Sequence, residues 1–279
     1  MTDKMVEGLF KHTSMLRKNF KYAFYVARCR SFSRSVVKEK LWSEYLRNPP
    51  ELVRTNEGFY LYLNPTDKHI SFQIAVTGEY NDIGDRFVNR LFKKLLKSSS
   101  LVVDVGANIG WYTFLAAKNA RRVVAFEPEL QNLSFLRKSR KRNSADNVEI
   151  LNYALSDRVG PVALSVSTKP GHHSIVRDVG AQVLVQSTTL DEAFSTETID
   201  LLKIDVEGAE PLVIKGASRL ISEGRIKVII MEWNPEVWSS TRLLEGFEML
   251  TTDGRVLGEP PPRKCNLYLR NKTLPSDGK

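Results

Sequence analysis

From residue 101 onward, apolar runs of strand length alternate with segments of helical character. Five runs are apolar on both faces, as buried strands of a parallel sheet require. They span residues 101–105, 122–127, 148–153, 200–205 and 226–231. Further strands are expected at 161–167, 182–187, 247–251 and 266–270. This alternation predicts an α/β fold with a doubly wound, largely parallel sheet and right-handed crossovers.

The first hundred residues show a different pattern. Residues 1–48 carry spaced aromatic side chains and no internal proline, which predicts a helical extension. Short strands are expected at 58–63 and 70–76, and a helix at 82–97 has apolar residues along one face. The predicted parts are a basic helical extension (1–50), short strands that lead into the core (51–80) and an α/β domain (81–272).

The composition narrows the classes of protein. The chain has 279 residues, of which 42% are hydrophobic, so it can bury a large core without disulfides. Its two cysteines and four histidines show no metal-ligand spacing. No early apolar run has the length of a signal sequence, and none approaches the roughly 20 residues of a membrane span. We therefore expect a cytoplasmic enzyme.

A strand that ends in an acid and runs into a glycine-bearing turn is the strongest chemical signal. Residues 101–110 read LVVDVGANIG, with Asp104 near the end of the strand. Gly106 and Gly110 allow the backbone to pass close to a ligand, where a side chain would block it. The next strand ends in Glu127, which is placed to accept hydrogen bonds from ribose hydroxyls.

Two classes of cofactor use this arrangement. A nicotinamide dinucleotide places its pyrophosphate at a helix N-terminus, whereas S-adenosylmethionine carries an ammonium, a carboxylate and a sulfonium. A carboxylate at Asp104 would repel a pyrophosphate but suits a cationic amino acid end. Asn108 also stands where the dinucleotide fingerprint has its middle glycine. The loop therefore favours S-adenosylmethionine over NAD.

Acidic residues follow two later strands. Asp205 and Glu207 lie in IDLLKIDVEGAE, and Glu232 and Asn234 lie in MEWNPE. Doubly wound folds bind ligands at the carboxyl ends of their strands, so we expect these side chains beside the first glycine loop. Glu210 is interpreted as a cap of the following helix.

In their order and spacing, these motifs resemble the FkbM family of S-adenosylmethionine-dependent methyltransferases. The resemblance covers about residues 78–268 and rests on VVDVGANIGWYT, VVAFEPE, ALSD, TTLDE and LLKIDVEGAE. It implies the Rossmann-like class I methyltransferase fold, with seven strands in the order 3-2-1-4-5-7-6 and an antiparallel last strand. It also implies methylation of a hydroxyl of a sugar, glycan precursor or other small metabolite.

The resemblance further implies which residues bind the cofactor. The expected contacts are Asp104, Gly106, Ala107, Asn108, Gly110, Glu127, Pro128, Ala154, Leu155, Asp157 and Asp205. Asp104 and its glycine loop would surround the methionine portion, Glu127 would hold the ribose, and residues 154–157 would border the adenine. Asp205 would lie between the cofactor and the acceptor.

Methyl transfer from a sulfonium is an in-line displacement, and a general base activates an acceptor hydroxyl. The candidate catalytic residues are Asp205, Glu207, His173 and Glu232. His173 lies between two expected strands, where a lid would form, and an ordinary polar loop is the alternative reading there. Mg²⁺ held by oxygen ligands at these strand ends is a further alternative, which we do not favour because the same acids would bind substrate hydroxyls.

Positive charge is concentrated near the N-terminus. In residues 1–50, Lys and Arg exceed Asp and Glu by seven, out of an overall net charge of +9. This arm would pack on the catalytic domain, contact an anionic membrane surface or, as the weakest alternative, bind nucleic acid. A second basic cluster at 137–142 is read as a solvated helix end. The rival functions are an RNA methyltransferase that uses the arm and a catalytically silent binding protein.

Overall fold

The computed structural model describes most of the chain after residue 41. The described residues are 42–43, 45–80, 87–97, 99–167, 174–176, 180–238 and 241–274. The chain divides into two compact units, Met1–Tyr80 and Asn81–Lys279. Most of the predicted helical extension therefore lies outside the described residues. Within the described residues, no helix is long and apolar enough to cross a membrane.

The first unit contains a hairpin and one helix. Strands β1 (Leu52–Arg54) and β2 (Tyr60–Tyr62) pair antiparallel, and α4 (Ile70–Thr77) follows. The rings of Trp42 and Tyr45 each lie 5.3 to 5.5 Å from the ring of Phe72. These aromatic contacts join residues before position 50 to the helix, so the unit has a small core of its own.

Residues 70–76 form helix α4, so the strand expected there is wrong. The Asp67 carboxylate, whose residue is only 2% exposed, accepts hydrogen bonds from the backbone N–H groups of His69, Ile70 and Ser71 at 2.8 to 3.3 Å. It therefore caps the first turn of the helix. The sequence ISFQIAV has no clear polar face, because several sides of this helix are buried. Its apolar run therefore resembled a strand.

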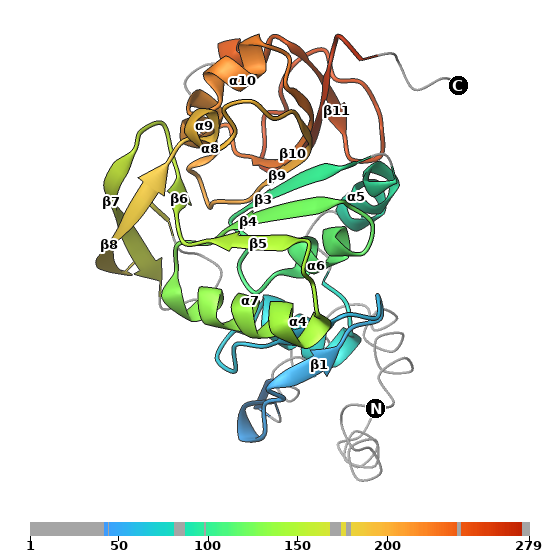
Figure 1. Ribbon diagram of the computed structural model, residues 1–279, viewed down its shortest axis with the longest axis vertical. Coiled ribbons are helices and arrows are strands. Elements are labelled where there is room, and N and C mark those ends of the chain that lie inside the picture. Colours follow the sequence, from blue (N-terminus) through green and yellow to red (C-terminus); the bar gives the residue numbers. More distant parts are fainter. Residues whose placement is uncertain are drawn as a thin grey trace. The chain divides into compact units, whose positions relative to one another are not determined.

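The second unit is built on a seven-stranded sheet. Its strands are β3 (Leu101–Val105), β4 (Arg122–Phe126), β5 (Val148–Leu151), β9 (Ile199–Ile204), β10 (Ile226–Trp233), β11 (Phe247–Thr251) and β12 (Cys265–Asn271). Their spatial order is β11-β12-β10-β9-β3-β4-β5, and β12 is antiparallel to both of its neighbours. Figure 1 shows β5, β4, β3, β9 and β10 side by side in this order. This arrangement confirms the predicted order 3-2-1-4-5-7-6 and the antiparallel last strand.

Helices cover both faces of this sheet. They are α5 (Val88–Leu96), α6 (Trp111–Ala117), α7 (Leu130–Asn143), α8 (Leu190–Ala193), α9 (Glu210–Lys215) and α10 (Ser218–Ser222), with a 3₁₀ turn at Arg242–Leu244. Val103 and Val105 of β3 share one core cluster with residues of α8, α9 and α10. The intervening Asp104 points to the other face, where it bonds to Thr113 of α6.

The chain leaves β3 toward β4 on one side and leaves β9 toward β10 on the other. Neighbouring strands β3 and β9 therefore form the topological switch point of the sheet. Ligands of doubly wound folds bind at the carboxyl ends of the strands at such a point.

A smaller sheet is inserted between β5 and β9. It contains β6 (Ala154–Leu155), β7 (Gly160–Ser167) and β8 (Gly180–Thr188), in the order β6-β8-β7. The strands expected at 161–167 and 182–187 are present as β7 and β8, which pair antiparallel. β5 ends at Leu151, two residues earlier than expected. The backbone N–H of Glu192 donates to Thr189 Oγ1 at 3.1 Å, so Thr189 caps the N-terminus of α8.

Candidate functional site

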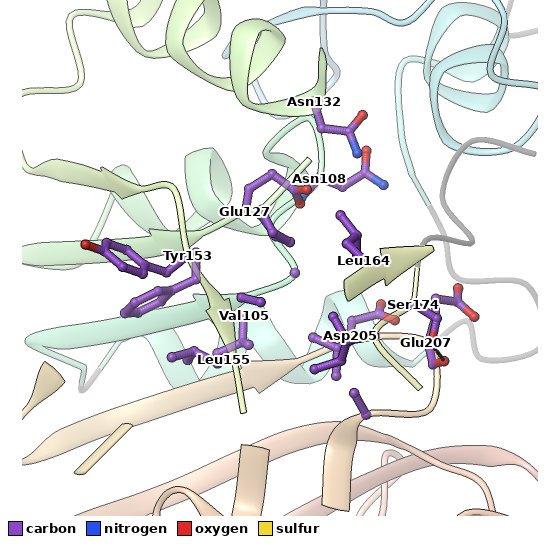
Figure 2. A pocket seen from close by; sticks show the side chains of 17 residues that line it. Val105, Asn108, Glu127, Asn132, Tyr153, Leu155, Leu164, Ser174, Asp205 and Glu207 are labelled. Carbon is purple, nitrogen blue, oxygen red and sulfur yellow. Dashed lines mark hydrogen bonds between the residues drawn. The ribbon is translucent and has the colours of Figure 1, made fainter. Parts of the chain in front are cut away.

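A pocket lies at the carboxyl ends of β3, β4 and β9, at the switch point of the sheet (Figure 2). It brings together predicted site residues from four separate motifs. Those that line it are Gly106, Asn108, Glu127, Pro128, Ala154, Leu155, Asp205 and Glu207. Figure 2 places Asn108, Glu127 and Asn132 on one side, with Asp205, Ser174 and Glu207 on the other. These two groups of side chains define two ends of the pocket.

The loop after β3 lies directly against the end of β9. Gly106 has φ +79°, and a Cβ atom there would lie 2.0 Å from the backbone oxygen of Asp205. Only glycine allows this approach. At Gly110, a Cβ would instead meet Leu136 and Phe114 at 2.5 to 2.6 Å. Both glycines are thus required by contacts within the protein, although the sequence suggested a close approach to a ligand.

Glu127 joins the loop after β3 to the end of β4. Its Oε2 accepts the backbone N–H of Asn108 at 2.7 Å, and its Oε1 accepts the N–H of Glu129 at 2.9 Å. Asn108 has φ +52°, a left-handed conformation that asparagine tolerates better than most residues. Burial raises the pKa of Glu127 to about 7, and the two backbone N–H groups oppose this rise.

Asp104 lies behind the pocket and does not line it. The residue is 2% exposed, and its Oδ2 accepts the hydroxyl of Thr113 at 2.6 Å. Burial raises the pKa of Asp104 to about 6, while the Thr113 hydrogen bond and the nearby Lys203 ammonium lower it. The buried Asp104 carboxyl group therefore changes its protonation near pH 6.

Asp205 and Glu207 form the acidic end of the pocket. Lys203 Nζ donates to Asp205 Oδ2 at 3.1 Å. Burial raises the pKa of Glu207 to about 8, with further contributions from Asp205 and Glu232, whereas Lys264 lowers it. The backbone at Glu207 is left-handed, with φ +53°, and its carbonyl accepts the hydroxyl of Ser174 at 3.1 Å.

Other predicted residues do not line the pocket. Glu232 forms an ion pair with Lys264 at 2.7 Å, and Asp157 forms one with Lys215 at 2.7 Å. Ala107 and Gly110 hold the loop without reaching the pocket. His173 lies outside the described residues. Glu210 was expected to cap the following helix, but its Oε1 accepts the N–H groups of Val206 and Gly208 in the loop before α9, which has no side-chain cap hydrogen bond. In the described part of the chain, no group of three or more His, Cys, Asp or Glu is arranged to hold a metal ion.

Several pocket residues were missed by the sequence argument. Asn132, Tyr153, Leu164 and Ser174 all line the pocket. Leu164 and Ser174 come from the inserted sheet, where Ser174 pairs with Ser165 of β7. The sequence indicated a lid in this region but carried no sign of which residues would face inward.

Comparisons with known proteins identify the family of the chain. The sequence model of the methyltransferase FkbM domain matches residues 104–249, just over half of the chain. The chain belongs to the FkbM methyltransferase family. Its relatives include Methyltransferase sdnD of Sordaria araneosa, 25% identical over 226 residues, with 67% of this chain and 83% of that protein covered.

Another relative of this FkbM methyltransferase is the hexuronic acid methyltransferase AglP of Haloferax volcanii. It is 25% identical over 171 residues, which cover 60% of this chain and 71% of that protein. Among solved structures, the putative methyltransferase yhhF from Escherichia coli has a TM-score of 0.45 and 13% identity, covering 80% of this chain and 99% of that chain. The strand order of the sheet is that of the class I methyltransferase fold.

Replacing Gly106 by Ala should destabilise the FkbM domain strongly, because the new Cβ meets backbone that cannot rotate away. Gly254→Ala is the matched control, since Gly254 has φ +92° but no atom within 4 Å of its Cβ position. In urea unfolding, Gly254→Ala should cost only the left-handed backbone strain, about 1–2 kcal/mol. Gly106→Ala should cost about 1–3 kcal/mol more. Equal losses in the two variants would contradict the described contact.

The carboxyl group of Glu207 should titrate near pH 8, which ¹³C NMR of labelled glutamate can measure. Its resonance is the one that disappears in Glu207→Gln. Because the folded pKa is raised, the folded state holds this proton more tightly than the unfolded state. Its contribution to stability therefore falls as pH rises from about 4.5 to about 8. Lys264→Met should move the titration to higher pH; a titration near the ordinary glutamate value would refute this electrostatic description.

Proposed function

We propose that this protein is an S-adenosylmethionine-dependent methyltransferase that methylates a hydroxyl of a sugar, glycan precursor or other small metabolite. The observation that carries the proposal is the charge of the pocket. Of the lining residues that the structure describes, Glu127, Asp205 and Glu207 are acidic and none is basic. Such a pocket favours a ligand with a sulfonium and an ammonium and disfavours a pyrophosphate.

Glu127 is the residue that would hold the ribose. A carboxylate has about four lone-pair positions. Backbone N–H groups occupy two of them, and the Asn132 side chain is a further hydrogen-bond partner. A ribose hydroxyl would take a position that stays open or would replace the Asn132 contact. Ala154 and Leu155 supply an apolar surface further along the pocket, and Tyr153 lies beside them, so this end suits the adenine.

The acidic end would hold the reacting groups. The cofactor supplies an electrophilic methyl group on its sulfonium. Glu207 would take the proton from the acceptor hydroxyl as the oxygen attacks that methyl carbon and the carbon–sulfur bond breaks. Its pKa of about 8 suits a general base near neutral pH. Asp205 would orient the acceptor or the methyl donor from the same side.

The residues at this end of the pocket support the proposed class of acceptor. Carboxylates bind hydroxyl groups by accepting their hydrogen bonds, and several hydroxyls on one molecule are typical of sugars. A relative of this chain is named as a hexuronic acid methyltransferase, which supports a sugar-related acceptor. Two acidic side chains at this end of the pocket disfavour a carboxylate acceptor, so we favour a hydroxyl as the methylated group.

Binding of S-adenosylmethionine should be weakened about 10- to 100-fold by Glu127→Gln, because hydrogen bonds to a charged acceptor are lost. Isothermal titration calorimetry measures this directly, with NAD as the comparison ligand. Glu129→Gln is the matched control: Glu129 lies two residues away and caps α7 by accepting the N–H groups of Gln131 and Asn132. It should leave the affinity unchanged. Binding of NAD instead, or equal effects of both variants, would overturn the cofactor assignment.

The product of turnover should be a methyl ether. Sugars and sugar precursors are incubated with the protein and S-adenosylmethionine that carries a radioactive methyl group. Label transferred to a hydroxyl survives mild alkali, whereas label on a carboxylate is released as methanol. Alkali-labile product would mean that a carboxylate is the acceptor. Cofactor binding without any transfer across a broad panel would favour the catalytically silent alternative.

A further inference from the structure

A lysine lies in the centre of the buried sheet. Lys203 is the fifth residue of β9, and its side chain is only 1% exposed. Strands of a parallel sheet that are covered on both faces are normally apolar, as the neighbouring Leu201, Leu202 and Ile204 are. An ammonium group in such a place is costly unless several groups compensate for its lost hydration.

The compensating groups come from three elements. Lys203 Nζ lies 3.1 Å from Asp205 Oδ2 and 3.4 Å from the backbone oxygen of Ile204. It also lies 5.2 Å from the centre of the Tyr112 ring on α6. On the adjacent strand β3, Asp104 is the register partner of Lys203, and the two charges interact.

Stability alone does not account for this network. Apolar residues of similar size are often at least as stable as a buried set of ion pairs. The network also has a particular position, because Asp104 and Asp205 lie at the carboxyl ends of β3 and β9, where the sheet changes direction. Asp205 lines the pocket, whereas Lys203 and Asp104 lie behind it.

We propose that Lys203 is a positioning residue that orients the Asp205 carboxylate at the methyl-donor end of the pocket and compensates the charge of Asp104 behind it. This inference rests on the proposed function, because the bound cation is S-adenosylmethionine. Two carboxylates and one ammonium leave one net negative charge. That charge complements the sulfonium, while a second ionised carboxylate without Lys203 would repel the first.

Removing Lys203 should change the protonation of Asp104. The charged and polar groups that face Asp104 are Lys203 and Asp205 from the β9 side and Thr113 from α6. Lys203 is a group that lowers the pKa of Asp104, which burial has raised to about 6. Removing the ammonium therefore raises that pKa further, so Asp104 takes up a proton at neutral pH. The affinity of the variant for the cofactor should then depend more steeply on pH above 6 than that of the wild-type protein.

The test is calorimetry of S-adenosylmethionine binding between pH 5.5 and 9. In the wild-type protein, protonation of Asp104 should weaken binding as the pH drops through about 6, in addition to the contributions of Glu127 and Glu207, which titrate near 7 and 8 in every variant. In Lys203→Met, the fall due to Asp104 should move upward by about 1–3 pH units, the usual effect of removing an opposite charge. At pH 7 the affinity should accordingly fall about tenfold or more and recover toward pH 9.

Lys227→Met is the matched control. Lys227 of β10 forms an ion pair with Asp200 Oδ1 at 2.6 Å, near the opposite end of β9. Its removal also deletes a lysine–aspartate pair from the sheet, but it should leave the pH profile where it is. An identical shift in both lysine variants would mean that general loss of stability explains the result.

The double variant Asp104→Asn/Lys203→Met keeps the test valid if Lys203→Met does not fold. It removes one charge of each sign, so the shifted pH dependence should disappear. Its affinity for S-adenosylmethionine should stay below that of the wild type, because Asp205 is no longer oriented. An unshifted profile in Lys203→Met, or wild-type affinity in the double variant, would overturn the role of Lys203. If the wild-type protein bound no S-adenosylmethionine at any pH, the proposed function itself would fall.

Discussion

The contact between the loop after β3 and the end of β9 is the constraint on which the rest of the site depends. Gly106 permits it, since a side chain would collide with the backbone oxygen of Asp205. The contact joins the two halves of the doubly wound sheet where their directions diverge. Glu127 then holds the same loop from the β4 side through the N–H of Asn108. The pocket is therefore shaped by backbone contacts that exist without a ligand, which is the preorganisation that binding and catalysis require.

Three acids in and behind the pocket have raised pKa values. Burial raises the pKa values of Asp104, Glu127 and Glu207 to about 6, 7 and 8. All three acids therefore titrate near neutral pH, where small changes in local charge alter their protonation. Lys203 stabilises the charged form of Asp104. Lys264 lowers the pKa of Glu207 and so partly offsets the repulsion from the neighbouring acids. A cationic cofactor would complete the charge balance of the FkbM methyltransferase.

The sequence predicted where the strands of the large sheet lie because each one is a distinct apolar run, and the resemblance to the FkbM family implied their order. The sequence prediction failed at α4, where the cap from Asp67 overrides an apolar run that resembles a strand. The role of Lys203 was not predictable, because it depends on pairing with Asp104 a hundred residues earlier. Tyr153 and Ser174 were missed for the same reason: what faces the pocket is decided by tertiary packing.

A crystal structure of the protein with S-adenosylhomocysteine tests the central claim most directly. The account predicts that the two ribose hydroxyls lie within hydrogen-bonding distance of Glu127, that the adenine contacts Ala154 and Leu155, and that the sulfur points toward Asp205 and Glu207. The loop after β3 should be unchanged, because protein contacts already hold it. A ligand bound elsewhere, or one whose ribose avoids Glu127, would contradict the account.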